Sequence, residues 1–115
     1  MFLDTMDRFA DLHRRVGRAN FGLTLDVGHL HCLDEGPIAG HILRWRKVLW
    51  NVHIEDMRRG VHDHLMFGAG EMDFPPILAA LRAASYAGGV HVELSRHSHD
   101  AVATARASLA FLRGL

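Results

Sequence analysis

Three short apolar runs in this chain each end on a side chain that can bind a metal ion: Leu23–Asp26, Leu49–His53 and Val90–Glu93. Because successive side chains of a β-strand point to opposite faces, alternate residues of each run share one side. The apolar side carries Leu23, Leu25, Trp50, Val52, Val90, Val92 and Leu94, and the polar side carries Thr24, Asp26, Asn51, His53, His91, Glu93 and Ser95. This repeat predicts parallel strands with helices outside and polar groups inside, as in a barrel.

Helical patterns precede, separate and follow these strands. Phe2, Met6, Phe9, Leu12 and Val16 recur at helical spacing and predict a helix at about 4–17, with Asp4 as its cap and Gly17 at its end. Further helices are expected from Gly36-Pro37, from Asp73 to Gly88, and from Asp100. Strands are expected at 21–27, 48–54 and 89–94, and loops at 28–31 and 55–72. Alternating helices and strands favour βαβ units in one α/β domain spanning residues 1–115.

The chain is short for a closed barrel of this kind. An eightfold βα barrel typically needs about 250 residues, and this chain has 115 residues with three expected strands. Three arrangements stay open at this point. The chain is the carboxy-terminal part of a longer protein, it folds as an open sheet, or it completes itself by pairing with another chain.

Composition excludes several classes of partner. The 13 basic and 13 acidic residues cancel, so nucleic acid is an unlikely partner and a small neutral or anionic ligand fits better. No apolar run approaches the roughly 20 residues that span a bilayer, so no membrane association is expected. With a single cysteine, Cys32, and no secretory signal at Met1–Asp4, we expect a reducing cytoplasmic location.

Asp26, His53 and Glu93 stand at equivalent ends of the three expected strands. The carboxyl ends of parallel strands meet at one mouth of a barrel, so these side chains should converge there. Two carboxylates and one imidazole suit Mn²⁺, Mg²⁺ or Co²⁺, and Zn²⁺ is possible. The alternative is that they are hydrogen-bonded polar residues of an ordinary barrel interior, although buried ionisable groups without a cation are costly.

The chain resembles the xylose-isomerase-like TIM barrels, which include sugar and sugar-phosphate isomerases and epimerases and the endonuclease IV branch. The resemblance rests on Leu25–His29, Asn51–Asp56, His64–Phe74 and Val90–Leu94, in the family's order and spacing. It implies a partial (β/α)8 barrel in which these are the last three βα units with a preceding helix. It also implies that the metal ligands are Asp26, His53 and Glu93, whereas the family's fourth ligand, a glutamate on the preceding strand, has no counterpart here.

The same resemblance implies further site residues. His29 matches a histidine that contacts substrate, and Arg59 matches an arginine that contacts substrate oxygens; the alternative for the latter is a solvated loop residue. His62 and His64 stand where nuclease members carry Asp-x-His ligands for additional zinc, so they are a possible second metal site or else part of an exposed lid loop. Arg96 follows the last strand, where barrels often bind phosphate, and is a candidate anion contact or part of a polar turn.

These residues lead to the hypothesis of a divalent-metal-dependent sugar or sugar-phosphate isomerase or epimerase that acts by proton transfer through an enediolate. Glu93 would be both ligand and catalytic proton carrier, and the partner would be a small carbohydrate. The first alternative is an endonuclease IV-like zinc phosphodiesterase, which the histidine at position 62 and the balanced charge disfavour. The second is a non-catalytic fragment or partner subunit that needs the missing part of a barrel or self-association.

Overall fold

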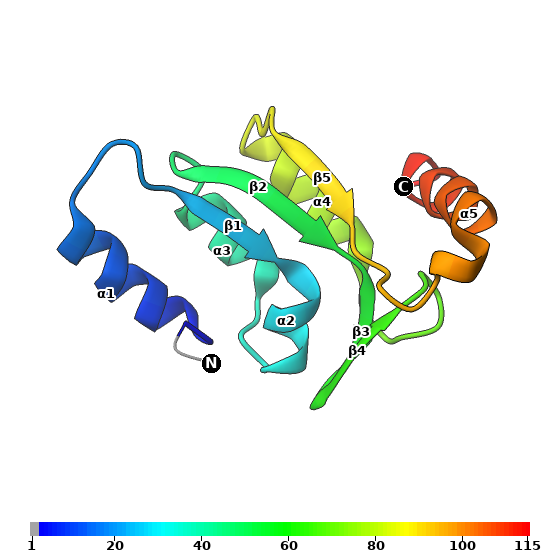
Figure 1. Ribbon diagram of the computed structural model, residues 1–115. Helices are drawn as coiled ribbons and strands as arrows, with labels where there is room; N and C mark the ends of the chain where they lie inside the picture. The colour runs from blue at the N-terminus through cyan, green and yellow to red at the C-terminus, as the bar shows by residue number, and fades with distance from the viewer. Residues whose placement is uncertain (1–2) are drawn as a thin grey trace.

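The computed structural model describes residues 3–115, so Phe2, expected on the first helix, lies outside the described residues. The centre of the fold is a parallel sheet in the order β1 (Leu23–Asp26), β2 (Leu49–Ile54) and β5 (Gly89–Val92). Figure 1 shows α3 (Ile38–Arg44) and α4 (Phe74–Ala83) side by side behind this sheet. The prediction of an α/β fold with a parallel sheet, consistent with part of a barrel, is confirmed.

The strands pair in a register that brings their carboxyl ends together. Asp26 of β1 lies opposite His53 of β2, and His53 lies opposite His91 of β5. The N–H of Glu93 donates to the carbonyl of Ile54 at 3.2 Å, which extends the pairing one residue beyond β5. Three strand-end side chains therefore start from neighbouring backbone positions at one edge of the sheet.

The apolar side of the sheet forms the core only in part, because Val90 and Val92 of β5 are each 38% exposed, and Trp50 of β2 departs further from the expected pattern. Leu25 and Val52 are buried as expected, but Trp50 is 51% exposed. The β1–β2 register skips Trp50, because Leu23 pairs with Leu49 while Thr24 pairs with Asn51. Because of this irregularity, the side chain of Leu49 points into the core and that of Trp50 points outward. Strict alternation of side chains along the strand does not predict this exchange.

The first and fourth helices differ in detail from their expected ends. Thr5, and not Asp4, caps α1 (Met6–Val16), because the Thr5 side chain accepts the N–H of Arg8 while Asp4 pairs with the Arg8 guanidinium. Gly17 ends α1 in a left-handed conformation, as expected. The α4 helix stops at Ala84 instead of continuing to Gly88, because Ser85 adopts a φ of 52° and turns the chain.

Two further elements replace expected loops. The segment Val27–Cys32 forms a helix, α2, directly after β1, because the Asp26 carboxylate accepts the N–H of His29 and caps it. Within 55–72, β3 (Asp56–Arg58) and β4 (Val61–Leu65) pair as an antiparallel hairpin. These strands are short and polar. The sequence there lacks the alternation of apolar and polar residues from which a strand can be predicted.

The last helix, α5 (Ala101–Arg113), follows a short 3-10 turn, η1 (Ser98–Asp100). The ring of Phe111 stacks on Phe67 with centroids 4.8 Å apart, which attaches α5 to the loop before α4. No helix in the described range 3–115 is long and apolar enough to cross a membrane. The cytoplasmic location expected above stays a prediction.

Asp56 organises the loop between β4 and α4. It is 2% exposed, and its carboxylate accepts the N–H groups of Met57, Gly68, Gly70 and Met72 at 2.9, 2.9, 3.0 and 3.1 Å. A Cβ at Gly70 would lie 2.2 Å from Oδ1 of Asp56, so the loop needs glycine there. One buried carboxylate thus accepts three backbone donors of this loop and one of β3.

Replacing Asp56 with alanine should lower the free energy of unfolding by at least about 3 kcal/mol, because several backbone donors would lose their acceptor at about 1–3 kcal/mol each. The matched control is Asp63→Ala, whose carboxylate makes a partly exposed ion pair with Arg96 at 3.5 Å and should cost less than about 1 kcal/mol. Urea unfolding followed by far-UV circular dichroism measures both. Equal losses in the two variants would contradict this role of Asp56.

Candidate metal and substrate site

The three strand-end residues meet at the carboxyl edge of the sheet. Potential ligand atoms of Asp26, His53 and Glu93 all lie within 4.8 Å of one another. Nδ1 of His53 and Oε2 of Glu93 are 2.8 Å apart, and all three residues are partly buried. The sequence predicted this convergence correctly, and the arrangement offers two carboxylates and an imidazole to one ion.

Neighbouring polar groups fix the orientation of His53. Its Nε2 lies 3.3 Å from the side-chain amide nitrogen of Asn51, which can only donate. Nε2 is then the acceptor and Nδ1 carries the proton that is donated to Glu93. An ion that binds at Nδ1 would have to displace this proton, so metal binding here should release protons.

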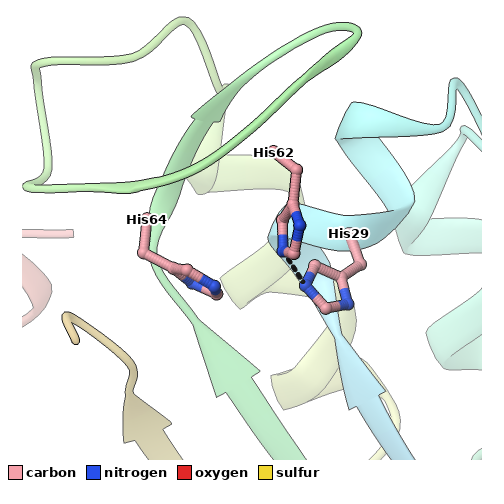
Figure 2. Close-up of side chains that lie close together, drawn as sticks. All are labelled: His29, His62 and His64. Carbon is pink, nitrogen blue, oxygen red and sulfur yellow. Dashed lines mark hydrogen bonds between the residues drawn. The ribbon is translucent and has the colours of Figure 1, made fainter.

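A second cluster lies beside the first. Nε2 of His29 and Nε2 of His62 are 2.7 Å apart, and the ligand atoms of His29, His62 and His64 all lie within 4.8 Å of one another. Figure 2 shows the three rings pointing toward one another from α2 and β4. His62 and His64 are two residues apart on one strand and share a face, as their spacing indicates. His29 joins them, an association that the sequence did not reveal.

Glu55 is a site residue that the sequence analysis missed. It is fully buried, and its ligand atoms lie within 4.8 Å of those of Asp26 and His29. Burial, followed by the negative charge of Asp26, a hydrogen bond to Asp26 and the negative charge of Glu93, raises the pKa of Glu55 to about 9. The available signal was spacing, because Glu55 stands two residues after His53 and alternation carries it toward the same side.

Gly28 makes room for Glu55 at the start of α2. A Cβ at this position would lie 2.4 Å from Oε1 of Glu55. Any larger residue would push either the helix or the carboxylate away. The glycine of the Asp-Val-Gly-His segment therefore allows α2 to approach the buried acid.

The two candidate arginines lie outside both clusters. Nε of Arg59 pairs with Asp34 at 3.4 Å, and Nη1 of Arg96 pairs with Asp63 at 3.5 Å. Their side chains are 63% and 76% exposed, respectively. Within residues 3–115, no hydrogen bond or ion pair joins either guanidinium to the three strand-end residues. Substrate contact by Arg59 or Arg96 stays a prediction.

A cavity of about 420 Å³ opens beside the site, between α1, β1 and α2. It reaches Asp26, His29 and His62 at one end. Elsewhere its lining is largely apolar and includes Phe9 and Leu23. The cavity lies on the outer side of β1, which is an edge strand of the sheet.

A parallel sheet with intervening helices and polar residues gathered at its strand ends is consistent with part of an α/β barrel. A family model described as xylose isomerase-like TIM barrel matches residues 1–115, and the chain belongs to this family. The chain is also 30% identical over 93 residues to a human protein whose name gives hydroxypyruvate isomerase as a provisional activity. That alignment covers 80% of this chain and 32% of the human protein.

The solved structures to which this fold is similar include epimerases of sugars or sugar derivatives. The 3-keto-D-glucoside 4-epimerase from E. coli matches with a TM-score of 0.78 and 25% identity, covering 99% of this chain and 41% of that one. The D-allulose 3-epimerase from Methylomonas sp. matches with a TM-score of 0.78 and 23% identity, covering 98% and 43%, and has also been solved with D-allulose. The chain thus spans less than half the length of each of these proteins.

The raised pKa of Glu55 predicts that, in the metal-free chain, the free energy of unfolding falls as the pH rises from 4.5 to about 9. Over this range the folded state retains a proton on Glu55 that the unfolded chain has released, so a higher pH favours unfolding. Glu55→Gln should remove this part of the slope. Urea unfolding in the presence of a chelator across this pH range measures it.

The control for this prediction is Glu71→Gln. Hydrogen bonds from the Arg59 backbone and from His31 lower the pKa of Glu71, so its titration falls below this pH window. The Glu71 variant should keep the wild-type slope. Parallel pH profiles for wild type and Glu55→Gln would contradict the assignment.

Proposed function

We propose that this chain supplies the metal-binding strands of a divalent-metal-dependent sugar or sugar-phosphate isomerase or epimerase. The observation that carries the proposal is the convergence of Asp26, His53 and Glu93, whose ligand atoms lie within 4.8 Å of one another. Oxygen-rich ligation with one nitrogen favours Mn²⁺, Mg²⁺ or Co²⁺, and Zn²⁺ is also compatible. Membership of the xylose isomerase-like TIM barrels and the epimerase names of similar structures support the reaction class.

Proton transfer is assigned to Glu93. When bound, the ion would supply positive charge beside the carbonyl and hydroxyl oxygens of the substrate. Glu93 would remove a proton from the hydroxyl-bearing carbon next to the carbonyl, and return of that proton to the former carbonyl carbon would complete an isomerisation. Protonation on the opposite face, as in epimerisation, would need a second acid, for which the family uses the preceding-strand glutamate that has no counterpart here. In the metal-free chain the hydrogen bond from His53 Nδ1 at 2.8 Å holds the Glu93 carboxylate at the strand-end site until an ion displaces that proton.

Substrate contacts are assigned to His29, Arg59 and Arg96. His29 lies closest to the strand-end residues, with Nδ1 3.6 Å from Oδ2 of Asp26. The two arginines have long, exposed side chains whose surface ion pairs are weak, so a negatively charged or hydroxyl-rich substrate could draw them inward. A small carbohydrate is the ligand class that fits these contacts, and the Methylomonas relative has been solved with D-allulose.

A second candidate function is zinc-dependent phosphodiester hydrolysis, as in the endonuclease IV branch. The histidine cluster favours it, because His62 and His64 could hold an additional metal ion. The balance of 13 basic and 13 acidic residues disfavours it, because nucleic acid requires a basic surface. The isomerase or epimerase assignment therefore remains the better supported of the two.

We also propose that the sheet pairs with further βα strands, from a longer polypeptide or from a second copy of the chain. Strands β1 and β5 each have one neighbour within residues 3–115, so one edge of each is open. Val90 and Val92 on β5 are both 38% exposed, and the largely apolar cavity adjoins β1. Open edges with apolar side chains favour pairing with another strand.

The proposed reaction predicts deuterium incorporation from D₂O into the carbon beside the substrate carbonyl, measured by NMR with D-allulose and hydroxypyruvate as probes. Glu93→Gln should slow this exchange at least about 100-fold in the Mn²⁺-loaded chain. Glu35→Gln is the control, since Glu35 accepts the Met6 N–H away from the strand ends. Exchange equal in wild type and Glu93→Gln would contradict proton transfer by Glu93.

The open sheet edges predict that the isolated chain self-associates in a concentration-dependent way, measured by gel filtration with light scattering. Val92→Lys places a charge on the exposed face of β5 and should shift the chain toward monomer. Val102→Lys is the control, because Val102 is 66% exposed on α5 away from either edge. A folded wild-type monomer at high concentration would contradict edge pairing between copies.

A further inference from the structure

We propose that Glu71 is a positioning residue, which holds the tip of the β3–β4 hairpin, and with it Arg59, against α2. Figure 1 shows this hairpin beyond the end of β2, and both of its strands contact α2. The inference rests on the proposed contact between Arg59 and substrate. The link between Glu71 and the hairpin is tested without substrate, so either can fail without the other.

The Glu71 carboxylate connects three elements. Its Oε1 accepts the backbone N–H of Arg59 at 2.6 Å and lies 3.2 Å from Nε2 of His31 on α2. The backbone N–H of Glu71 donates to the carbonyl of Met57 on β3 at 3.2 Å. Glu71, in the loop before α4, thus binds the hairpin through both its side chain and its backbone, and the same carboxylate reaches α2.

Glu71 carries its negative charge at neutral pH. Hydrogen bonds from the Arg59 backbone and from His31 lower the pKa of Glu71 from its ordinary value of 4.5. An ionised carboxylate only accepts hydrogen bonds, so Nε2 of His31 must carry a proton. Hydrogen bonds to a charged acceptor are shorter and stronger than those between neutral groups. The charge of Glu71 therefore strengthens both bonds that hold the hairpin tip.

The hairpin tip, residues 58–61, has few other anchors. The N–H of Gly60 donates to the carbonyl of Cys32 at 2.9 Å. Nε of Arg59 lies 3.4 Å from Asp34, but both side chains are mostly exposed, and such ion pairs contribute little. A short two-stranded hairpin is only marginally stable by itself. Within residues 3–115, the Glu71 carboxylate is the one side-chain group that accepts a backbone N–H of the tip.

This tether prepares the Arg59 side chain for substrate. With its backbone fixed, the guanidinium can leave Asp34 by side-chain rotation alone, without reordering of the hairpin. The tether also holds the hairpin against α2, which carries His29, the other proposed substrate contact. A loop that is ordered in advance lowers the entropy cost of binding. Loss of Glu71 should therefore weaken substrate binding through Arg59.

The first test is the exchange of the Arg59 and Gly60 amide protons with water, measured by NMR on the metal-free chain. Glu71→Ala should raise both exchange rates at least about tenfold, because the tip loses its anchor. Glu71→Gln should stay near wild type, since its side-chain oxygen still accepts the Arg59 N–H. The matched control Asp34→Ala removes only the ion pair of the Arg59 guanidinium and should leave both rates unchanged.

Exchange rates that do not change in Glu71→Ala, or that rise equally in Asp34→Ala, would overturn the tether. A wild-type measurement covers the case in which Glu71→Ala does not fold. NMR coupling through the hydrogen bond should join the Arg59 amide nitrogen to the Glu71 carboxylate carbon. Absence of this coupling from the folded wild-type chain would also overturn the tether.

The second test is the Kd for D-allulose of the Mn²⁺-loaded chain, measured by calorimetry. Glu71→Ala should raise this Kd about tenfold, because the arginine is no longer held in place before binding. Glu71→Gln should leave the Kd unchanged, and Glu71→Ala should add little in a chain that already carries Arg59→Gln.

Equal Kd values for wild type and Glu71→Ala, or fully additive effects in the double variant, would overturn the positioning of Arg59. A wild-type chain without affinity for D-allulose would contradict the proposed function instead. The amide exchange rates decide the tether in that case as well.

Discussion

The register of the parallel sheet is the constraint on which the candidate site depends. Backbone pairing sets Asp26 opposite His53, and the Glu93 N–H donates to the Ile54 carbonyl. A slip of one residue would turn the strand-end side chains to the core side. Burial of Leu25 and Val52 behind the sheet makes such a slip costly. The hydrophobic core and the polar cluster are therefore two results of a single register.

Alternation along the chain directs two adjacent carboxylates to different surroundings, where one stabilises a loop and the other lies in the candidate site. Glu55 and Asp56 are both buried at the end of β2, and they point to different surroundings. Asp56 accepts four backbone N–H groups and holds the loop before α4. Glu55 lies beside Asp26, His29 and His64 and accepts none of these backbone groups. Burial beside Asp26 raises the pKa of Glu55 to about 9, so this group keeps its proton at neutral pH.

The sequence predicted the strands and the convergence of Asp26, His53 and Glu93 because both depend on local alternation, which residues such as Leu25 and Asp26 display directly. It also predicted the family, which the match over residues 1–115 confirms. Trp50 was misplaced because a break in strand register leaves no mark in the residue pattern. The α2 helix was missed because its cap, Asp26, is also the last residue of a strand. Glu55 was missed because its place in the site depends on its burial. That burial arises only when the folded chain brings Gly28 against the Glu55 carboxylate.

The central claim is that the strand ends of this sheet surround one divalent ion. Crystals grown with Mn²⁺ and measured at a wavelength that maximises its anomalous signal test this most directly. We expect an anomalous peak bonded to Asp26, His53 and Glu93 together. A structure in which these side chains keep their direct contacts and the manganese signal lies elsewhere would contradict the claim.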